Sequence, residues 1–203
     1  MKLNLIRGRE AAICAAIGVV GALVFLFAFP RGSISTLMHE VLGLPGPGAG
    51  IALVLGPFLV LMALISRLLS RRVGGALIAA LTFGAAYALV TRLLEIPTNP
   101  KGAFGSPVFI AAVALFGIVV EAVMVLGKAL PNVWRCMLCG ALANAGLLGF
   151  YWAVIFPHTA GRVSWKALPV LLGLCLACGL VSGYIAWAVG KRLSSAFALN
   201  EEK

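Results

Sequence analysis

The chain has 203 residues, of which 62% are apolar and only 11% charged, and its mean hydropathy is +1.09. A soluble domain has about 45–50% apolar and about 25% charged residues, so this composition excludes a soluble enzyme domain and predicts a chain solvated by lipid. The net charge of +10 lies in short clusters between apolar runs, which indicates charge that orients helices rather than charge that binds nucleic acid.

Six apolar runs follow one another along the chain, each long enough to cross a bilayer core of roughly 30 Å as a helix. The sequence therefore predicts an all-α fold, a single polytopic membrane domain spanning 1–203. The first run is full length and ends at Phe29-Pro30, which favours a helix over a cleaved signal peptide. The predicted transmembrane helices lie near residues 11–29, 49–66, 73–91, 108–127, 136–156 and 168–190.

Positive charge is distributed unequally between the two sides that these six crossings define. One side carries 11 of the Lys and Arg residues and the other carries five. Because Lys and Arg accumulate in cytoplasmic loops, both termini are predicted to be cytoplasmic, and the cell membrane is the expected location.

The first helix is rich in small residues at its cytoplasmic end. Ala11 and Ala15, and likewise Ala12 and Ala16, are four residues apart on neighbouring faces. Small residues at this spacing let helices approach closely in lipid. The stripe predicts contact either within the bundle or with a helix of another protein. Similar stripes in the third, fifth and sixth helices are interpreted as internal packing.

After the first helix, an outside segment is predicted to form a short amphipathic flap. Its apolar residues recur at helical spacing, and Gly43 and Pro45 are expected to end it. The apolar residues are Ile34, Leu37, Met38, Val41 and Leu44. The flap is expected to lie at the membrane interface.

Glu121 is the one carboxylate that lies well inside an apolar run. A charged side chain in the membrane is costly and normally faces the protein interior or a water-filled cavity. Glu121 is therefore a candidate counter-charge for a cationic solute, a proton or ion site, or a structural tie between two helices. The sequence leaves these alternatives open.

Aromatic and amide side chains in the later helices could form a solute pocket. Rings with polar tips suit a flat heterocycle, although aromatic residues also gather at membrane interfaces without binding anything. The candidate substrate-binding residues, with Glu121, are Tyr87, Asn144, Tyr151, Tyr184 and Trp187.

Neither a catalytic motif nor a metal motif is apparent, and no cofactor is expected. The sequence lacks Gly-x-Ser-x-Gly and the phosphate-cradling Gly-x-x-x-x-Gly-Lys-Ser/Thr, so the chain is not predicted to be an enzyme or to hydrolyse ATP itself. The pairs Cys136/Cys139 and Cys175/Cys178 are expected at different membrane depths, which argues against one tetrahedral zinc site. Small-residue packing is the expected role of these cysteines.

The whole pattern resembles the S components, the substrate-binding subunits of energy-coupling factor (ECF) transporters. The resemblance rests on the length, the six helices, the alanine-rich first helix and the long loop after it. Leu55-Gly56-Pro57 and the run Arg71-Arg72-Val73-Gly74-Gly75-Ala76 are also similar to the family's usual sequence. The branch specific for metals is not matched, because Met1 is followed by Lys2.

The resemblance implies capture of a vitamin-like micronutrient in the outward half, with the first outside loop closing over it. It also implies a transmembrane T component and two cytoplasmic ATPases as partners, the T component being contacted by Ala11, Ala12, Ala15 and Ala16. Thiamine or its pyrimidine precursor is the favoured solute, because Glu121 could pair with a cation. The alternatives are a stand-alone permease that uses Glu121 and a structural subunit of a larger membrane complex.

Overall fold

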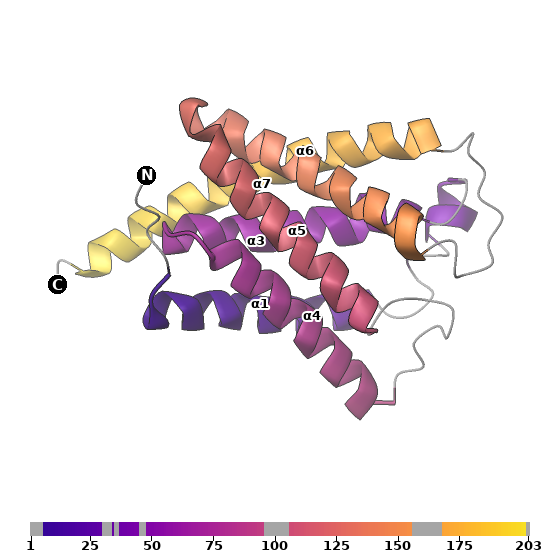
Figure 1. Ribbon diagram of the computed structural model, residues 1–203, viewed down its shortest axis with the longest axis horizontal. Helices are drawn as coiled ribbons and strands as arrows, with labels where there is room; N and C mark the ends of the chain where they lie inside the picture. Colours follow the sequence, from indigo (N-terminus) through magenta and orange to yellow (C-terminus); the bar gives the residue numbers. More distant parts are fainter. Residues whose placement is uncertain are drawn as a thin grey trace.

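A computed structural model of the chain describes residues 6–29, 34, 37–44, 48–95, 106–155 and 168–201. All the regular elements in these ranges are helical (Figure 1). The elements are α1 (Gly8–Ala28), η1 (Leu37–Val41), η2 (Ile51–Leu55), α3 (Gly56–Ser70), α4 (Gly75–Leu93), α5 (Pro107–Leu126), η3 (Gly127–Ala129), α6 (Asn132–Phe150), η4 (Tyr151–Ile155) and α7 (Leu168–Glu201).

Within the described ranges, six helices are long and apolar enough to span a membrane, which confirms the predicted all-α architecture. Most boundaries lie within a few residues of the predicted ones. The largest difference is at α7, which continues to Glu201 instead of ending near residue 190. Its last three turns contain neither Gly nor Pro after Gly190, so nothing in the local sequence ends the helix where the apolar run ends.

Helix α3 lies at the centre of the bundle. It packs against α1, α4, α6 and α7, while α1, α4, α5, α6 and α7 follow one another around it (Figure 1). Of the most apolar stretch of each span, 56% is buried in η2–α3 but only 28% in α1 and in α7. The sides of α1 and α7 that face away from α3 are therefore the least covered parts of the bundle.

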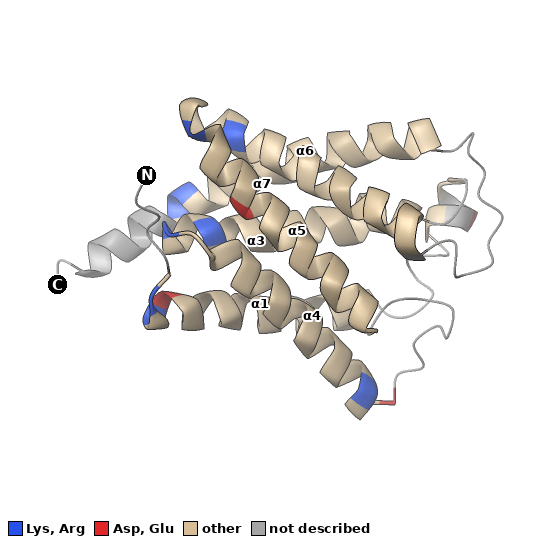
Figure 2. Ribbon diagram, viewed as in Figure 1, with Lys and Arg blue, Asp and Glu red and all other residues tan. Residues whose placement is uncertain are grey.

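The start of α1 and the end of α7 lie at the same end of the bundle, where Lys and Arg gather (Figure 2). An ion pair of 3.0 Å between Arg72 Nε and Glu10 Oε2 joins the α3–α4 turn to the start of α1 there. A backbone bond from Ile6 N–H to Val73 O adds to this junction. The positive-inside rule makes this the cytoplasmic end, as the charge distribution in the sequence predicted.

Helices α6 and α7 pack with their backbones in close contact. Gly140 and Gly179 lie backbone against backbone, and a Cβ atom on either would overlap the carbonyl oxygen of the other. In lipid, such close approach gives van der Waals contact that larger side chains would prevent. The sixth-helix stripe is therefore packed internally through Gly179 and Gly183, whereas Gly149 and Ala153 of the fifth-helix stripe are exposed.

The described part of the predicted flap is a short helical turn at the opposite, outer end. Gly43 has φ +60°, and Leu44 N–H donates to Met38 O at 2.9 Å, so the turn ends at a left-handed glycine as predicted. Met38 is only 3% exposed and forms an apolar cluster with Leu148 of α6 and Leu171 of α7. Pro45 lies outside the described residues.

Candidate functional site

Tyr87 belongs to an aromatic cluster in the outer half of the bundle. Its ring centroid lies 5.4 Å from that of Phe109, 6.1 Å from that of Phe83 and 6.4 Å from that of Phe25. Four rings from α1, α4 and α5 thus meet at spacings typical of aromatic pairs. The half-buried Tyr87 is the member of this group with a hydroxyl group.

Tyr151 lies at the outer end of α6, where the helix changes to the π-helical turn η4. It is half-buried and packs against the main core. Ile34, from the segment before η1, packs against both this core and the apolar cluster around Met38. Tyr151 and the flap are therefore at the same end of the molecule, as the sequence predicted.

Asn144 is fully buried and joins three elements. Its Nδ2 donates to Ala52 O at 2.9 Å and to Cys175 O at 2.8 Å. In the π-helical turn η2, Gly56 N–H bonds to Ile51 O, and the next donor in that register would be Pro57, which has no N–H. The Asn144 amide thus supplies the hydrogen bond that Ala52 O would otherwise lack, which is a structural role that the helical spacing alone did not reveal.

Glu121 is held by two partners near the cytoplasmic end of α5. Its Oε2 lies 2.9 Å from Arg67 Nε, and its Oε1 accepts a hydrogen bond of 2.8 Å from Ala76 N–H. The Nε–H of Arg67 is not aligned for a hydrogen bond, so the contact is an ion pair. The first turn of α4 adds the favourable potential of a helix N-terminus. Of the alternatives that the sequence left open, this geometry is that of a structural tie.

Tyr184 and Trp187 lie towards the cytoplasmic end of α7 and not in its outer half. Tyr184 is 50% exposed on the outside of the bundle, with its ring centroid 5.8 Å from that of Trp187. Lys191 Nζ lies 5.7 Å from the centroid of the Trp187 ring, within range of a cation–π contact. The six candidate residues therefore do not form one site, because Glu121, Tyr184 and Trp187 lie towards the end opposite the flap.

The alanines of α1 divide between two environments. Ala11 and Ala15 are half-buried, whereas Ala12 and Ala16 are exposed. Ala16 borders an open apolar groove of about 510 Å³ between α1 and α3. The other residues that line the groove are Ile13, Ile17, Val20, Gly21, Val24, Phe58, Leu61, Met62 and Ile65.

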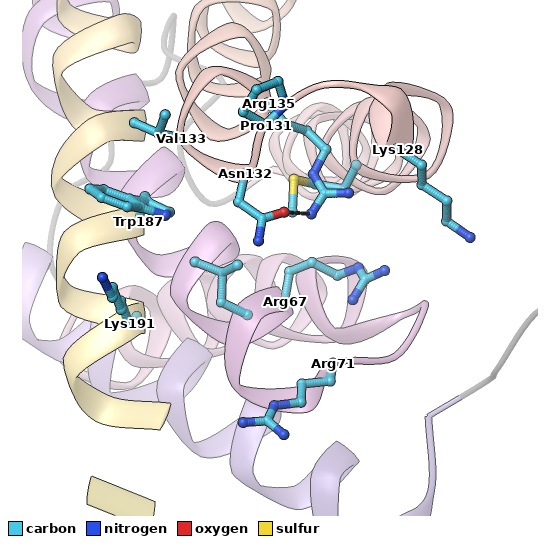
Figure 3. Close-up of a pocket in the computed structure, with 12 residues that line it drawn as sticks. Arg67, Arg71, Lys128, Pro131, Asn132, Val133, Arg135, Trp187 and Lys191 are labelled. Carbon is cyan, nitrogen blue, oxygen red and sulfur yellow. Dashed lines mark hydrogen bonds between the residues drawn. The ribbon is translucent and has the colours of Figure 1, made fainter. Parts of the chain in front are cut away.

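A second cavity, of about 680 Å³, opens at the cytoplasmic end and was not predicted from the sequence. Trp187 borders it, and five cationic side chains from α3, the α3–α4 turn, the α5–α6 turn, α6 and α7 surround it (Figure 3). The only signal in the sequence was the clustering of positive charge between helices. These five are Arg67, Arg71, Lys128, Arg135 and Lys191.

The cysteines take part in helix packing. Cys139 Sγ lies 3.6 Å from Val120 O and Cys14 Sγ lies 3.6 Å from Ser66 O, each across a helix contact. Among the described residues, no group of three or more His, Cys, Asp and Glu side chains is placed to hold a metal ion.

Comparison with known proteins supports the fold through structural similarity, without a match to a family model or to a curated sequence. No protein-family model matches the sequence, and no curated protein matches it. The chain is similar to a solved structure described as the crystal structure of an S-component of an ECF transporter, with a TM-score of 0.66 and 21% identity. The match covers 96% of this chain and 87% of the other, so the protein has the S-component fold over nearly its whole length.

Proposed function

We propose that the protein is the membrane-embedded substrate-binding subunit of an ECF-type importer in the cell membrane. The S-component fold over 96% of the chain is the observation that carries this proposal. On this view the chain is not an enzyme, and partner ATPases supply the energy for transport.

The outer half is where solute capture is proposed. Tyr87 and Tyr151 are half-buried aromatic side chains at the end where the flap packs, and each has a hydroxyl that can select a solute orientation. A vitamin-like heterocycle fits such a lining. The preference for thiamine or its precursor loses its basis, because Glu121 is already paired with Arg67 and is not free to balance a cationic solute.

The exposed face of α1 is the proposed contact with the T component. Ala12 and Ala16 leave the helix backbone accessible, and the groove beside Ala16 offers an apolar surface at which a partner helix can pack. The half-buried Ala11 and Ala15 border the same face and are partly covered by this bundle.

The experiment is gentle purification of tagged protein from its native membrane, followed by native mass spectrometry. Wild-type protein should retain a T component and two ATPases, and it should bind a member of a vitamin panel. The variant Ala12→Leu/Ala16→Leu should lose the partners but keep the solute. Tyr87→Ala and Tyr151→Ala should weaken solute binding while the partners remain.

A matched control variant and the outcomes that would contradict the proposal complete this test. Ala111 and Ala122 are exposed alanines of α5, so Ala111→Leu/Ala122→Leu should retain the partners. Wild-type protein that binds no heterocycle and retains no T component would contradict the proposal. Proton-driven uptake by the purified chain alone in proteoliposomes would instead favour a stand-alone permease.

A further inference from the structure

We propose that the cytoplasmic cavity binds the phosphate group of an anionic molecule. This binding site is distinct from the solute site of the outer half, and the inference does not depend on the transport function proposed above. The shared chemistry is a phosphate monoester or diester, which either a lipid headgroup or a soluble phosphate compound can present.

Positively charged side chains from separate elements line the cavity. Charge that only orients helices needs only to flank them, but here cations from five parts of the chain line one cavity (Figure 3). Among the described residues that line the cavity, none is acidic. Just beyond the lining, Glu121 forms an ion pair with one of the five cations, Arg67. Like charges that line one cavity repel each other, and a bound anion would relieve that repulsion.

The guanidinium of Arg135 supplies hydrogen-bond donors at the cavity. Arg135 Nη2 donates to Asn132 Oδ1, while the buried Nε of Arg135 has no hydrogen-bond partner. A guanidinium presents a planar set of donors that matches the oxygens of phosphate. Arg135 is thus oriented by Asn132 through one bond, and a guanidinium carries five N–H donors, so others remain for a ligand.

The depth of the cavity in the membrane and its partly apolar lining also suit a phosphate compound. Arg67 lies in the last turn of α3, and Lys191 lies in the last turn of the membrane span of α7, so the cavity lies near the level of the inner-leaflet headgroups. Apolar side chains, including Leu68, Met124 and Trp187, also line it. The lining therefore suits a phosphate with a less polar group attached. A choline headgroup is disfavoured, because its cation would meet the protein cations.

The test uses the full chain in phosphatidylcholine nanodiscs. Two probes are compared: phosphatidylglycerol added to the bilayer, and glycerol 3-phosphate added to the buffer. Binding is measured by native mass spectrometry and by the rise in the unfolding temperature, because a ligand of the folded state stabilises it. Wild-type protein should respond to at least one probe, and less so as NaCl is raised. A response to phosphatidylglycerol alone identifies a lipid source, and a response to glycerol 3-phosphate identifies a soluble source.

Variants decide whether the cavity is responsible. Arg71 and Lys128 are exposed, so Arg71→Gln/Lys128→Gln should fold normally and bind about tenfold more weakly, as loss of one to two charge-assisted contacts would give. Arg7→Gln/Arg9→Gln removes the same charge from exposed positions at the start of α1 and should bind like wild type.

Three results would overturn the proposal. The first is no response of the wild type to either probe, and the second is equal weakening in both double variants. The third is binding of an acidic peptide, such as oligoglutamate, without any response to the phosphate probes, which would assign the cavity to a protein partner.

Discussion

Small residues line both the α6–α7 contact and the exposed side of α1, but the structure uses the two stripes differently. Gly140 and Gly179 bring two backbones of this chain together. Ala12 and Ala16 remain exposed. The same spacing in sequence therefore marks a closed contact in one region and an open face in the other.

A small-residue stripe thus indicates one property of a helix and leaves another open. The stripe shows that a backbone is accessible, because small side chains leave room for another helix. It does not show whether that helix belongs to the same chain. In the closed region, hydrogen bonds from Asn144 reinforce the backbone approach, whereas the α1 face borders an open groove.

The largest expected effect is on the closed contact itself. Gly179→Leu would force α6 and α7 apart, because even a Cβ at this position overlaps the backbone of α6. We expect a loss of more than about 4 kcal/mol of stability, seen as little folded protein in a thermal unfolding assay in detergent. Gly173→Leu is the control on the same helix, where a Cβ meets nothing within 4 Å. Equal stability of the two variants would contradict a closed α6–α7 contact.

Glu121→Gln tests whether the ion pair between Arg67 and Glu121 stabilises the fold as much as the close backbone contact of α6 and α7 does. The side chains of Arg67 and Glu121 are 11% and 10% exposed, so loss of the carboxylate leaves a largely buried cation without its partner. We expect a loss of about 3 kcal/mol, measured by the same assay, and partial recovery in Arg67→Gln/Glu121→Gln. Glu10→Gln breaks the more exposed pair with Arg72 and should cost no more than about 1 kcal/mol. If Glu121→Gln costs no more than Glu10→Gln, the structural role of Glu121 is wrong.

Asn144→Leu keeps the size of the side chain but removes the hydrogen bonds from Asn144 to Ala52 O and to Cys175 O. Ala52 O then lacks a donor, and the expected loss is about 1–3 kcal/mol in the same unfolding assay. Ser182→Ala is a suitable comparison, because the Ser182 hydroxyl bonds to Cys178 O within its own helix. Unfolding of Asn144→Leu at the wild-type temperature would show that the amide does not join these helices.

The smallest effect on stability is expected at the open face. Ala12→Leu/Ala16→Leu should change the unfolding free energy of the isolated protein by no more than about 0.5 kcal/mol, because both side chains are exposed. Ala22 is only 1% exposed on the same helix, so Ala22→Leu should be clearly destabilising. A strongly destabilised Ala12→Leu/Ala16→Leu variant would mean that this face is packed within the bundle.

Prediction from sequence was most accurate for the features that lipid imposes directly. The six spans and the cytoplasmic ends follow from apolar length and charge distribution, and the flap ends at Gly43 as predicted. It was least accurate for side chains whose role depends on a distant partner. Spacing along α5 could not show that Glu121 meets Arg67, and spacing along α7 could not show that Trp187 borders a cytoplasmic cavity.

Six crossings and a charged cytoplasmic end follow from the sequence alone, because a bilayer requires long apolar helices and Lys- and Arg-rich loops stay on the cytoplasmic side. The packing of the helices settles which small residues meet each other, which donor serves Ala52 O and which cations line one cavity. These contacts join residues far apart in the chain, and their geometry depends on how the helices cross rather than on the order of residues within any one helix.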